Sequence, residues 1–481
     1  MANPLCRLRG ARSACKVPVL GFLLLMQACE KPAAPQAFMA SPRVTIDLDS
    51  IKSRGYINAL VDNNSVSYFI FRGEPMGYEY ELLQRFAEDI GVELRIKIIS
   101  GVDESIDRLN KGEGDVIAFP LTITEERSKY VSFSDPLFTT TQVLVQRRDT
   151  LHEPPIRLHA DLIGKQIYVM RNSSFKDRLQ RLSEEVGGQI VIVEDSAGAE
   201  TESLIRQVAM GEIPLTVTDQ TFAMVNASIY PDLDINTIIS LPQEIGWATR
   251  TNSPDLTGAV NTWLTNFKKQ RNYQNIYDRY FKSPRTTLIR MNSDYSSLHG
   301  GRLSDFDETI RDEAEALGWD WRLVASVMYQ ESGFNPNVRS WAGAVGLMQL
   351  MPAASRQFKV ADPHDPVQNI HAGIKVLQYL DGLWAKTIDD PYERLKFVLA
   401  SYNVGISHVI DARNLALKYG KDPTKWDGNV ETYLMLKTKP QYYRDPVASA
   451  GYCRCMGPVN YVKEVLGRFE AYKAHIERVP S

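Results

Sequence analysis

The sequence predicts two successive domains, an α/β domain followed by an all-α domain. From about residue 44, strand-like and helix-like segments alternate, which is typical of α/β folds. Beyond about residue 295, apolar residues recur every three or four positions, which is the period of a helix. Charge divides at the same place, because residues 300–481 carry 22 basic and 22 acidic side chains, which leaves the net negative charge in the first part.

The composition excludes several classes of protein. The chain has 481 residues, of which 44% are apolar and 23% charged, so intrinsic disorder is excluded. Five cysteines are too few for disulfides to stabilise a fold of this length, so hydrophobic cores must stabilise it. A net charge of −3 is unlike that of a dedicated nucleic-acid-binding protein, which carries a basic excess.

Residues 1–28 are predicted to be a secretory signal. Four basic residues precede the apolar run 17–26, and ten residues span only about 15 Å as a helix, half of a bilayer core. Removal of this segment, which has four basic and no acidic residues, changes the net charge from −3 to −7.

The end of this run predicts a lipid anchor. Met26 to Cys29 resembles a bacterial lipobox, in which the cysteine is acylated and becomes the first mature residue. Residues 29–43 are rich in Pro and Ala and suit a tether. Glu30 resembles the class of lipoproteins sent to the outer membrane, so we expect a peripheral protein anchored at its periplasmic face. A plain signal peptide cleaved nearby is the alternative.

The α/β elements of the first domain follow in order. The sequence predicts strands over 55–61, 92–99 and 115–119, and helices over 77–90 and 102–110. The first helix places Leu82, Leu83, Phe86 and Ile90 on one stripe. Repeated strand–helix units predict a mostly parallel sheet with its ligand at the carboxyl ends of the strands.

Three segments of this domain resemble periplasmic amino-acid-binding proteins of solute-binding family 3. They are residues 77–83 (GYEYELL), residues 114–137 (GDVIAFPLTITEER and then VSFSDPL), and residues 162–174 (LIGKQIYVMRNSS). The resemblance covers about residues 44–285, and we place the end of the domain at 295. It implies a periplasmic-binding-protein-like fold, in which two α/β lobes close on a ligand.

The same resemblance implies the ligand-binding residues. Arg127 corresponds to the arginine that holds a ligand α-carboxylate in a bidentate pair. Thr122 and either Ser173 or Ser174 would donate hydroxyls, and Asp219 would hold the α-ammonium group. A surface arginine and a strand-end cap are the alternatives for Arg127 and Asp219. Pro120 stands where the family often has a small polar residue, which leaves the ligand open between an amino acid and a wall-derived peptide.

The second domain, residues 296–481, contains one helix with an acidic residue on its apolar face. Asp320 is predicted to cap this helix and Gly333 to end it. Glu331 lies three, four and seven positions after three apolar residues (Met328, Val327 and Val324), so burial should raise its pKa. The alternative is a glutamate at the end of the helix that reaches solvent.

Three segments around Glu331 resemble the lysozyme-like lytic transglycosylases of the soluble lytic transglycosylase family. They are residues 331–336 (ESGFNP), 343–352 (GAVGLMQLMP) and 399–405 (LASYNVG). The resemblance covers about residues 305–470 and implies a goose-type lysozyme fold. With the solute-binding domain in front, the whole chain resembles the membrane-bound lytic murein transglycosylases.

The activity implied is water-free cleavage of peptidoglycan between N-acetylmuramic acid and N-acetylglucosamine. Glu331 would be the single acid/base, and the product would be a 1,6-anhydromuramyl end. No second carboxylate stands in these segments, whereas glycosidases that work with two carboxylates need one. The residues implied to contact glycan or Glu331 are Ser332, Met348, Gln349, Tyr402, Asn403 and, in residues 457–462 (GPVNYV), Tyr461. Core packing is the alternative for both tyrosines.

No cofactor or metal site is expected. The seven histidines show no zinc-ligand spacing. Cys453 and Cys455 are open to pairing with each other or to remaining free thiols. The expected partners are peptidoglycan glycan strands, the ligand of the first domain and, through the anchor, a membrane; nucleic acid is not expected. Two other functions stay open: a transport-type solute receptor whose second domain only grips peptidoglycan, and a hydrolytic lysozyme.

Overall fold

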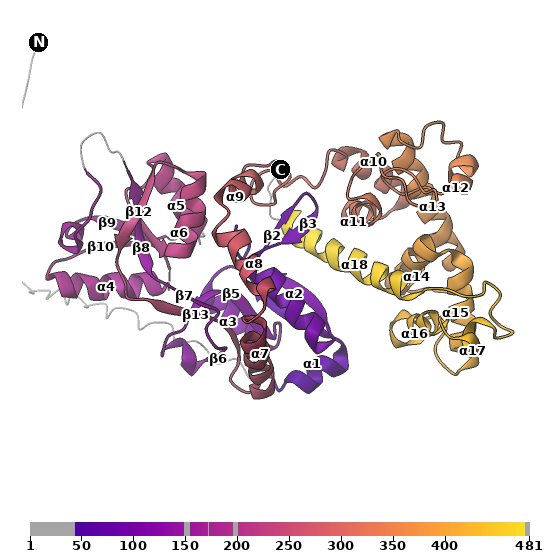
Figure 1. The fold of residues 1–481 in the computed structure, drawn as a ribbon, viewed down its shortest axis with the longest axis horizontal. Coiled ribbons are helices and arrows are strands. Elements are labelled where there is room, and N and C mark those ends of the chain that lie inside the picture. Colours follow the sequence, from indigo (N-terminus) through magenta and orange to yellow (C-terminus); the bar gives the residue numbers. More distant parts are fainter. Residues whose placement is uncertain (1–43, 149–153, 172, 196–200, 477–481) are drawn as a thin grey trace, which may run out of the picture. The chain divides into compact units, whose positions relative to one another are not determined.

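Two sheets with helices around them build the first part of the chain (Figure 1). The structure, a computed structural model, describes residues 44–148, 154–171, 173–195 and 201–476. The predicted signal, the predicted lipidation site Cys29 and the predicted tether lie outside the described residues.

The first lobe contains the elements that the sequence predicts for residues 44–122. Its sheet has the strand order β4-β1-β5-β13-β6, and β7 also pairs with β13. The strands are β1 (Tyr56–Val61), β4 (Glu93–Ile98), β5 (Val116–Thr122), β6 (Val131–Phe133), β7 (Phe138–Thr140) and β13 (Gln243–Arg250). The helices are α1 (Leu48–Arg54), α2 (Tyr78–Ile90), α3 (Val102–Lys111), η1 (Arg127–Lys129), α7 (Pro254–Phe267) and α8 (Arg271–Phe281). The next helix, α9 (Pro284–Met291), packs mainly on α6 (Gln220–Ile229) of the second lobe.

The second lobe is built on a sheet with the order β10-β9-β11-β8-β12. Its strands are β8 (Gln142–Arg147), β9 (Gln166–Met170), β10 (Val191–Asp195), β11 (Thr216–Asp219) and β12 (Leu233–Ile238). Its helices are η2 (His159–Leu162), α4 (Ser174–Val186), α5 (Thr201–Met210) and α6 (Gln220–Ile229). The two-lobed α/β fold is therefore confirmed.

The prediction of a mostly parallel sheet is confirmed, because one strand in each sheet, β13 in the first and β8 in the second, runs against all the others. β1 pairs in parallel with β4 and β5, but β13 runs antiparallel to β5, β6 and β7. In the second lobe β8 is likewise antiparallel to both β11 and β12. The cause is the way the chain changes lobes, because it leaves through β7 and β8 and returns through β12 and β13. A returning strand enters its sheet from the opposite end.

The second domain is helical, as predicted. Its helices are α10 (Asp307–Leu317), α11 (Trp321–Ser332), α12 (Pro352–Gln357), α13 (Pro366–Trp384), α14 (Pro391–Val404), α15 (Ile406–Lys418), η3 (Trp426–Val430), α16 (Glu431–Leu436), α17 (Pro440–Tyr443) and α18 (Met456–Ile476). The predicted stripe of α13 is buried, at Ile370, Ile374, Leu377 and Leu380. Between α17 and α18, Cys453 and Cys455 form a disulfide. Among the described helices, none is long and apolar enough to cross a bilayer.

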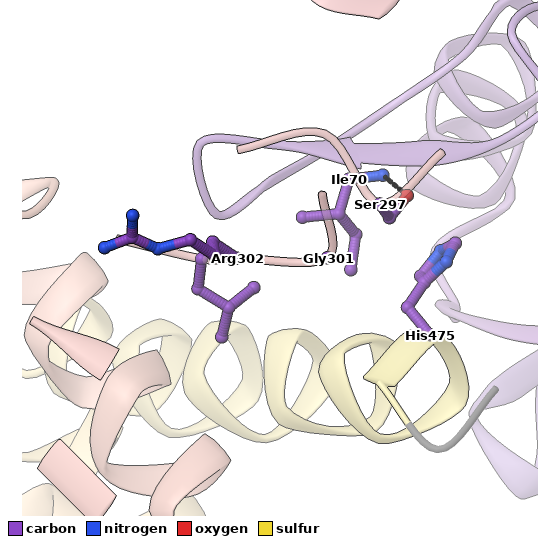
Figure 2. A pocket seen from close by; sticks show the side chains of 6 residues that line it. Ile70, Ser297, Gly301, Arg302 and His475 are labelled. Carbon is purple, nitrogen blue, oxygen red and sulfur yellow. Dashed lines mark hydrogen bonds between the residues drawn. The ribbon is translucent and has the colours of Figure 1, made fainter. Parts of the chain in front are cut away.

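A hairpin of the first lobe, β2 (Phe69–Phe71) and β3 (Glu74–Met76), contacts α18. At its turn, Tyr472 donates a hydrogen bond to the Gly73 carbonyl at 2.6 Å. Gly73 has a φ of +79°, and a Cβ there would lie 2.5 Å from the ring of Phe334. Figure 2 shows a small pocket lined by residues of β2, of α18 and of the segment before α10: Ile70, Ser297, Gly301, Arg302, Leu303 and His475.

Candidate active site

Glu331 is carried by the last turn of α11. The helix begins at its predicted cap, where the Asp320 carboxylate accepts the backbone N–H of Arg322 at 2.9 Å, and it ends at Gly333 with a φ of 58°. Val324, Val327 and Met328 are fully buried, so the apolar face of α11 is the one that the sequence predicts. Helical spacing then places Glu331 at the edge of this face.

One hydrogen bond and burial set the acidity of Glu331. The Tyr461 hydroxyl, from α18, donates to Glu331 Oε1 at 2.6 Å. Burial raises the pKa of Glu331 from 4.5 to about 7, and the bond from Tyr461 opposes this rise. Within the described residues, no second carboxylate is among the influences on this pKa. A carboxylic acid with this pKa can donate a proton near neutral pH and accept one afterwards.

Hydrogen bonds hold together residues 338–350, which we call the 338–350 loop. The side-chain amide of Gln349 donates to the carbonyls of Val338 at 3.1 Å and Gly346 at 2.9 Å, so this amide nitrogen is engaged in holding the loop. The side chain of Met348 is buried. Its backbone N–H donates to Asn369 Oδ1 at 2.7 Å.

Tyr402 joins this loop to the neighbourhood of Glu331. Its hydroxyl donates to the Met348 carbonyl at 2.7 Å. Burial raises the pKa of Tyr402 well above 10, and the nearby negative charge of Glu331 adds to this rise. Asn403 is exposed to solvent at the end of α14. Ser332 bonds back to its own helix, with its hydroxyl donating to the Met328 carbonyl at 3.1 Å.

The structure therefore assembles Glu331, Tyr402, Met348 and Tyr461 from four different elements. Ser332, as it stands, turns its hydroxyl to α11, and Met348 meets Tyr402 through its carbonyl rather than through its thioether. Asn369 was missed by sequence reasoning. It is fully buried, and its amide also donates to the carbonyls of Val345 and Pro363. The sequence feature that could have indicated Asn369 is its place directly before Ile370, the first residue of the apolar stripe of α13.

A second polar cluster lies between the lobes of the first domain. Arg127 donates to the Thr122 carbonyl at 3.0 Å. Burial lowers the pKa of Arg127, while the carboxylates of Asp177, Asp103 and Asp219 raise it. Asp219, at the end of β11, is buried, which raises its pKa to about 7 against the opposing charge of Arg127. One carboxylate oxygen of Asp219, Oδ1, has no hydrogen-bond partner.

Hydroxyls and amides link the lobes beside this cluster. The Thr122 and Ser174 hydroxyls lie 3.4 Å apart. Gln142 donates to Ser174 at 3.3 Å and to Gln243 at 2.9 Å, and these two glutamines begin the strands β8 and β13 at the crossings between the lobes. Ser173 donates instead to the Met170 carbonyl at 2.7 Å. Sequence reasoning missed both glutamines, which stand at ordinary strand starts.

The described part of the chain contains no group of three or more histidine, cysteine or acidic side chains that could hold a metal ion. Both sites are built from carboxyl, hydroxyl, amide and guanidinium groups.

Known proteins resemble the two halves separately and the chain as a whole. The family model of bacterial extracellular solute-binding proteins, family 3, matches residues 57–283, and that of the transglycosylase SLT domain matches residues 308–424. A solved structure of a mutant of ArgBP from T. maritima has 29% sequence identity and a TM-score of 0.43, covering 49% of this chain and 99% of that one.

Two curated relatives match over most of their length. Membrane-bound lytic murein transglycosylase F of Desulfosudis oleivorans is 34% identical over 425 residues, which cover 88% of this chain and 91% of the relative. The protein of the same name from Pseudomonas fluorescens is 30% identical, covering 93% and 88%. The segments around Glu331, the solute-binding half in front of them and these relatives agree: the chain belongs to the membrane-bound lytic murein transglycosylase F family.

Proposed function

We propose that this lytic transglycosylase, a lyase, cleaves the β1,4 bond between N-acetylmuramic acid and N-acetylglucosamine with Glu331 as its single acid/base. Protonated Glu331 gives its proton to the glycosidic oxygen, and the bond from this oxygen to the muramyl anomeric carbon breaks. The muramyl C6 hydroxyl then attacks that carbon, and its proton returns to Glu331. A 1,6-anhydro ring forms, and no water is consumed.

The observation that carries this proposal is a half-buried glutamic acid, bonded by Tyr461, whose pKa is raised to about 7 with no second carboxylate of the described residues among the influences on that pKa. A residue that must first donate and later accept a proton works best with a pKa close to the working pH. A mechanism with two carboxylates would need a second acid beside the sugar. In its place, the N-acetyl group of the substrate itself would stabilise the positive charge at the anomeric carbon.

Digestion of purified sacculi, with mass analysis of the soluble products, tests the proposal. Anhydromuropeptides are the expected product. Muropeptides with reducing ends would instead identify a hydrolytic lysozyme, and the absence of release would identify a receptor that only grips the wall. Glu331→Gln should abolish release, and substantial residual lysis by this variant would reject Glu331 as the acid/base.

The first domain is proposed to bind an amino acid or a peptide released from the wall and to regulate cleavage. Arg127 would pair with the ligand carboxylate, Asp219 with its ammonium group, and Thr122 and Ser174 would supply hydroxyls. The unpartnered oxygen of Asp219 beside Arg127 supports a zwitterionic ligand, because both charges would then be matched.

Calorimetry with single amino acids and with wall-derived peptides tests this second proposal. Binding should be lost in Arg127→Gln and kept in Lys129→Gln, a change at the other end of the same short helix. A ligand that binds should also change the rate of sacculus digestion. An unchanged rate of sacculus digestion at saturating ligand would be compatible with the proposed binding site but would reject regulation of cleavage by the ligand.

The lipid anchor and the outer membrane are also proposed for this chain, from the lipobox-like segment at Cys29 and from the membrane-bound relatives. Cys29→Ser should move the protein from the membrane fraction to the soluble periplasmic fraction. Retention of this variant in the membrane would reject the anchor, and sedimentation of the wild-type protein with the inner membrane would reject the outer-membrane assignment.

A further inference from the structure

One tryptophan in the second domain is fully exposed. The relative exposure of Trp341 is 101%, the highest among the exposed large apolar side chains of the described residues. Trp341 belongs to the 338–350 loop, and the same loop buries Leu347, Met348 and Leu350. The loop therefore hides its smaller apolar side chains and leaves its largest one in water, which costs free energy unless something covers the ring.

Trp341 is held on a closed turn. The Ser340 N–H donates to the Ala344 carbonyl at 2.9 Å, and the Gly343 N–H donates to the Ser340 carbonyl at 3.0 Å. The Ala344 N–H donates to the Ser340 hydroxyl at 3.0 Å. With the backbone fixed in this way, only the two side-chain torsions of Trp341 stay free, so little conformational entropy is lost when the ring binds a partner.

The base of this loop belongs to the candidate active site. Val345 forms bridges with both Arg339 and Leu350, and the Met348 carbonyl accepts the hydroxyl of Tyr402. Because Arg339 bridges to Val345 and Ser340 bonds to Ala344, Trp341 stands two residues past the bridge, in the turn that closes the loop. Trp341 thus lies on the same hydrogen-bonded segment as Met348, whose carbonyl accepts Tyr402.

We propose that Trp341 is a stacking platform for a sugar of the glycan strand, beyond the two sugars joined by the scissile bond. In a β1,4-linked hexosamine the ring substituents are equatorial, and both faces of the sugar present axial C–H groups. An indole face is a flat apolar surface that matches them, and its N–H can bond an exposed sugar oxygen. This inference rests on the proposed function, because it takes the glycan strand as the substrate.

Steady-state kinetics with isolated, peptide-free glycan strands give the first test. Trp341→Ala should raise KM about tenfold and leave kcat within about twofold, as expected when a remote contact of about 1.4 kcal/mol is lost. Trp341→Phe, which keeps a flat ring, should restore KM to within about threefold. Tyr392→Ala removes another exposed aromatic ring, at the far end of α14 from Tyr402, and should change neither constant.

Fluorescence quenching by acrylamide gives the second test, in the inactive Glu331→Gln protein. Of the seven tryptophans, four (Trp247, Trp263, Trp384 and Trp426) are buried and two (Trp319 and Trp321) are partly buried, so Trp341 dominates the accessible emission. Saturating glycan strands should protect this emission, and Trp341→Phe should remove the protectable component.

The two proposals fail in different ways. Unchanged KM in Trp341→Ala, or full quenching of Trp341 while the strands are bound, would overturn the stacking role. Retained cleavage by Glu331→Gln would instead overturn the proposed function, whatever Trp341 does.

Discussion

At the scale of single residues, the proposed chemistry depends on one carboxyl group and the hydroxyl beside it. Burial makes Glu331 a weaker acid, and the hydrogen bond from Tyr461 partly restores its acidity. The same contact raises the pKa of the Tyr461 phenol, which burial already raises well above 10. Tyr461 therefore stays protonated across the working pH range and keeps the hydrogen that it donates to the ionised Glu331.

Tyr461→Phe should move the pH dependence of cleavage. The lost hydrogen bond stabilised the Glu331 carboxylate, so the pKa of Glu331 should rise above about 7. A general acid with a higher pKa stays protonated to higher pH, and the alkaline limb of the kcat/KM profile should shift upward. Tyr402→Phe is the matched control, because the Tyr402 hydroxyl bonds the Met348 carbonyl and not Glu331. An alkaline limb that does not move in Tyr461→Phe, or that moves equally in both variants, would contradict this account.

Glu331→Gln should stabilise the protein at alkaline pH. The folded pKa of about 7 exceeds the ordinary value of 4.5, so the folded chain keeps a proton that the unfolded chain has released. Stability from this group is complete below pH 4.5 and falls as pH rises towards 7, by up to about 3 kcal/mol. Urea unfolding at pH 4 and pH 8 should show equal stability at the first pH and a more stable variant at the second.

The sequence could single out Glu331 because helical spacing places it on the apolar face and the segments around it resemble those of the transglycosylase family. It could not predict where the Ser332 hydroxyl and the Gln349 amide point. Both bond to backbone carbonyls nearby, and which carbonyl is within reach depends on local backbone geometry that residue spacing does not contain. Asn369 acts on a loop more than twenty positions away, which is a tertiary contact.

At the scale of elements, the 338–350 loop depends on a glycine that has no room for a side chain. Gly346 has a φ of +80°, and a Cβ there would lie 2.3 Å from Asn369 Nδ2 and 2.4 Å from the Pro363 carbonyl. Any side chain would push Asn369 away from Met348 and so disturb the carbonyl that receives Tyr402. The close approach explains why this position is a glycine.

Gly346→Ala should lower both stability and cleavage. We expect a loss of roughly 2–4 kcal/mol in the free energy of unfolding, since backbone strain and a clash add, and a fall in kcat of at least about tenfold. Gly343→Ala is the control in the same loop, because Gly343 also has a positive φ, +89°, but nothing within 4 Å of its Cβ position. Equal losses in the two variants would show that strain alone accounts for the effect.

The elements differ in how far sequence could define them. α11 carries its own start and stop signals at Asp320 and Gly333, and both are used. The direction of β13 could not be predicted from the sequence. It is set by the point at which the chain re-enters the first lobe, after about a hundred residues in the second lobe. Local pattern predicts a strand, whereas tertiary connection decides whether its neighbours are parallel.

At the scale of the whole molecule, the turn of the β2–β3 hairpin lies against aromatic residues of α11 and α18. The nearest atoms to a Cβ at Gly73 would belong to Phe334, Tyr472 and Tyr329, and Phe334 follows Glu331 by three residues. Gly73→Ala should therefore loosen this contact and lower the melting temperature. Gly55→Ala is the control, because Gly55 also has a positive φ but open space around its Cβ position. The difference in melting temperature between the two variants measures the contribution of the contact, and equal melting temperatures would show that the contact contributes nothing.

The hydrogen bond between Tyr461 and Glu331 joins residues 130 positions apart in the chain. It can therefore form only after α18 has been synthesised. Synthesis runs from the N-terminus, so Glu331 emerges well before α18. Until α18 docks, the glutamate has neither its partner nor its burial, and it ionises like any glutamate in water. A nascent or partly exported chain that ends before α18 thus contains the proposed catalytic acid in its ionised form, without the proton that it would donate.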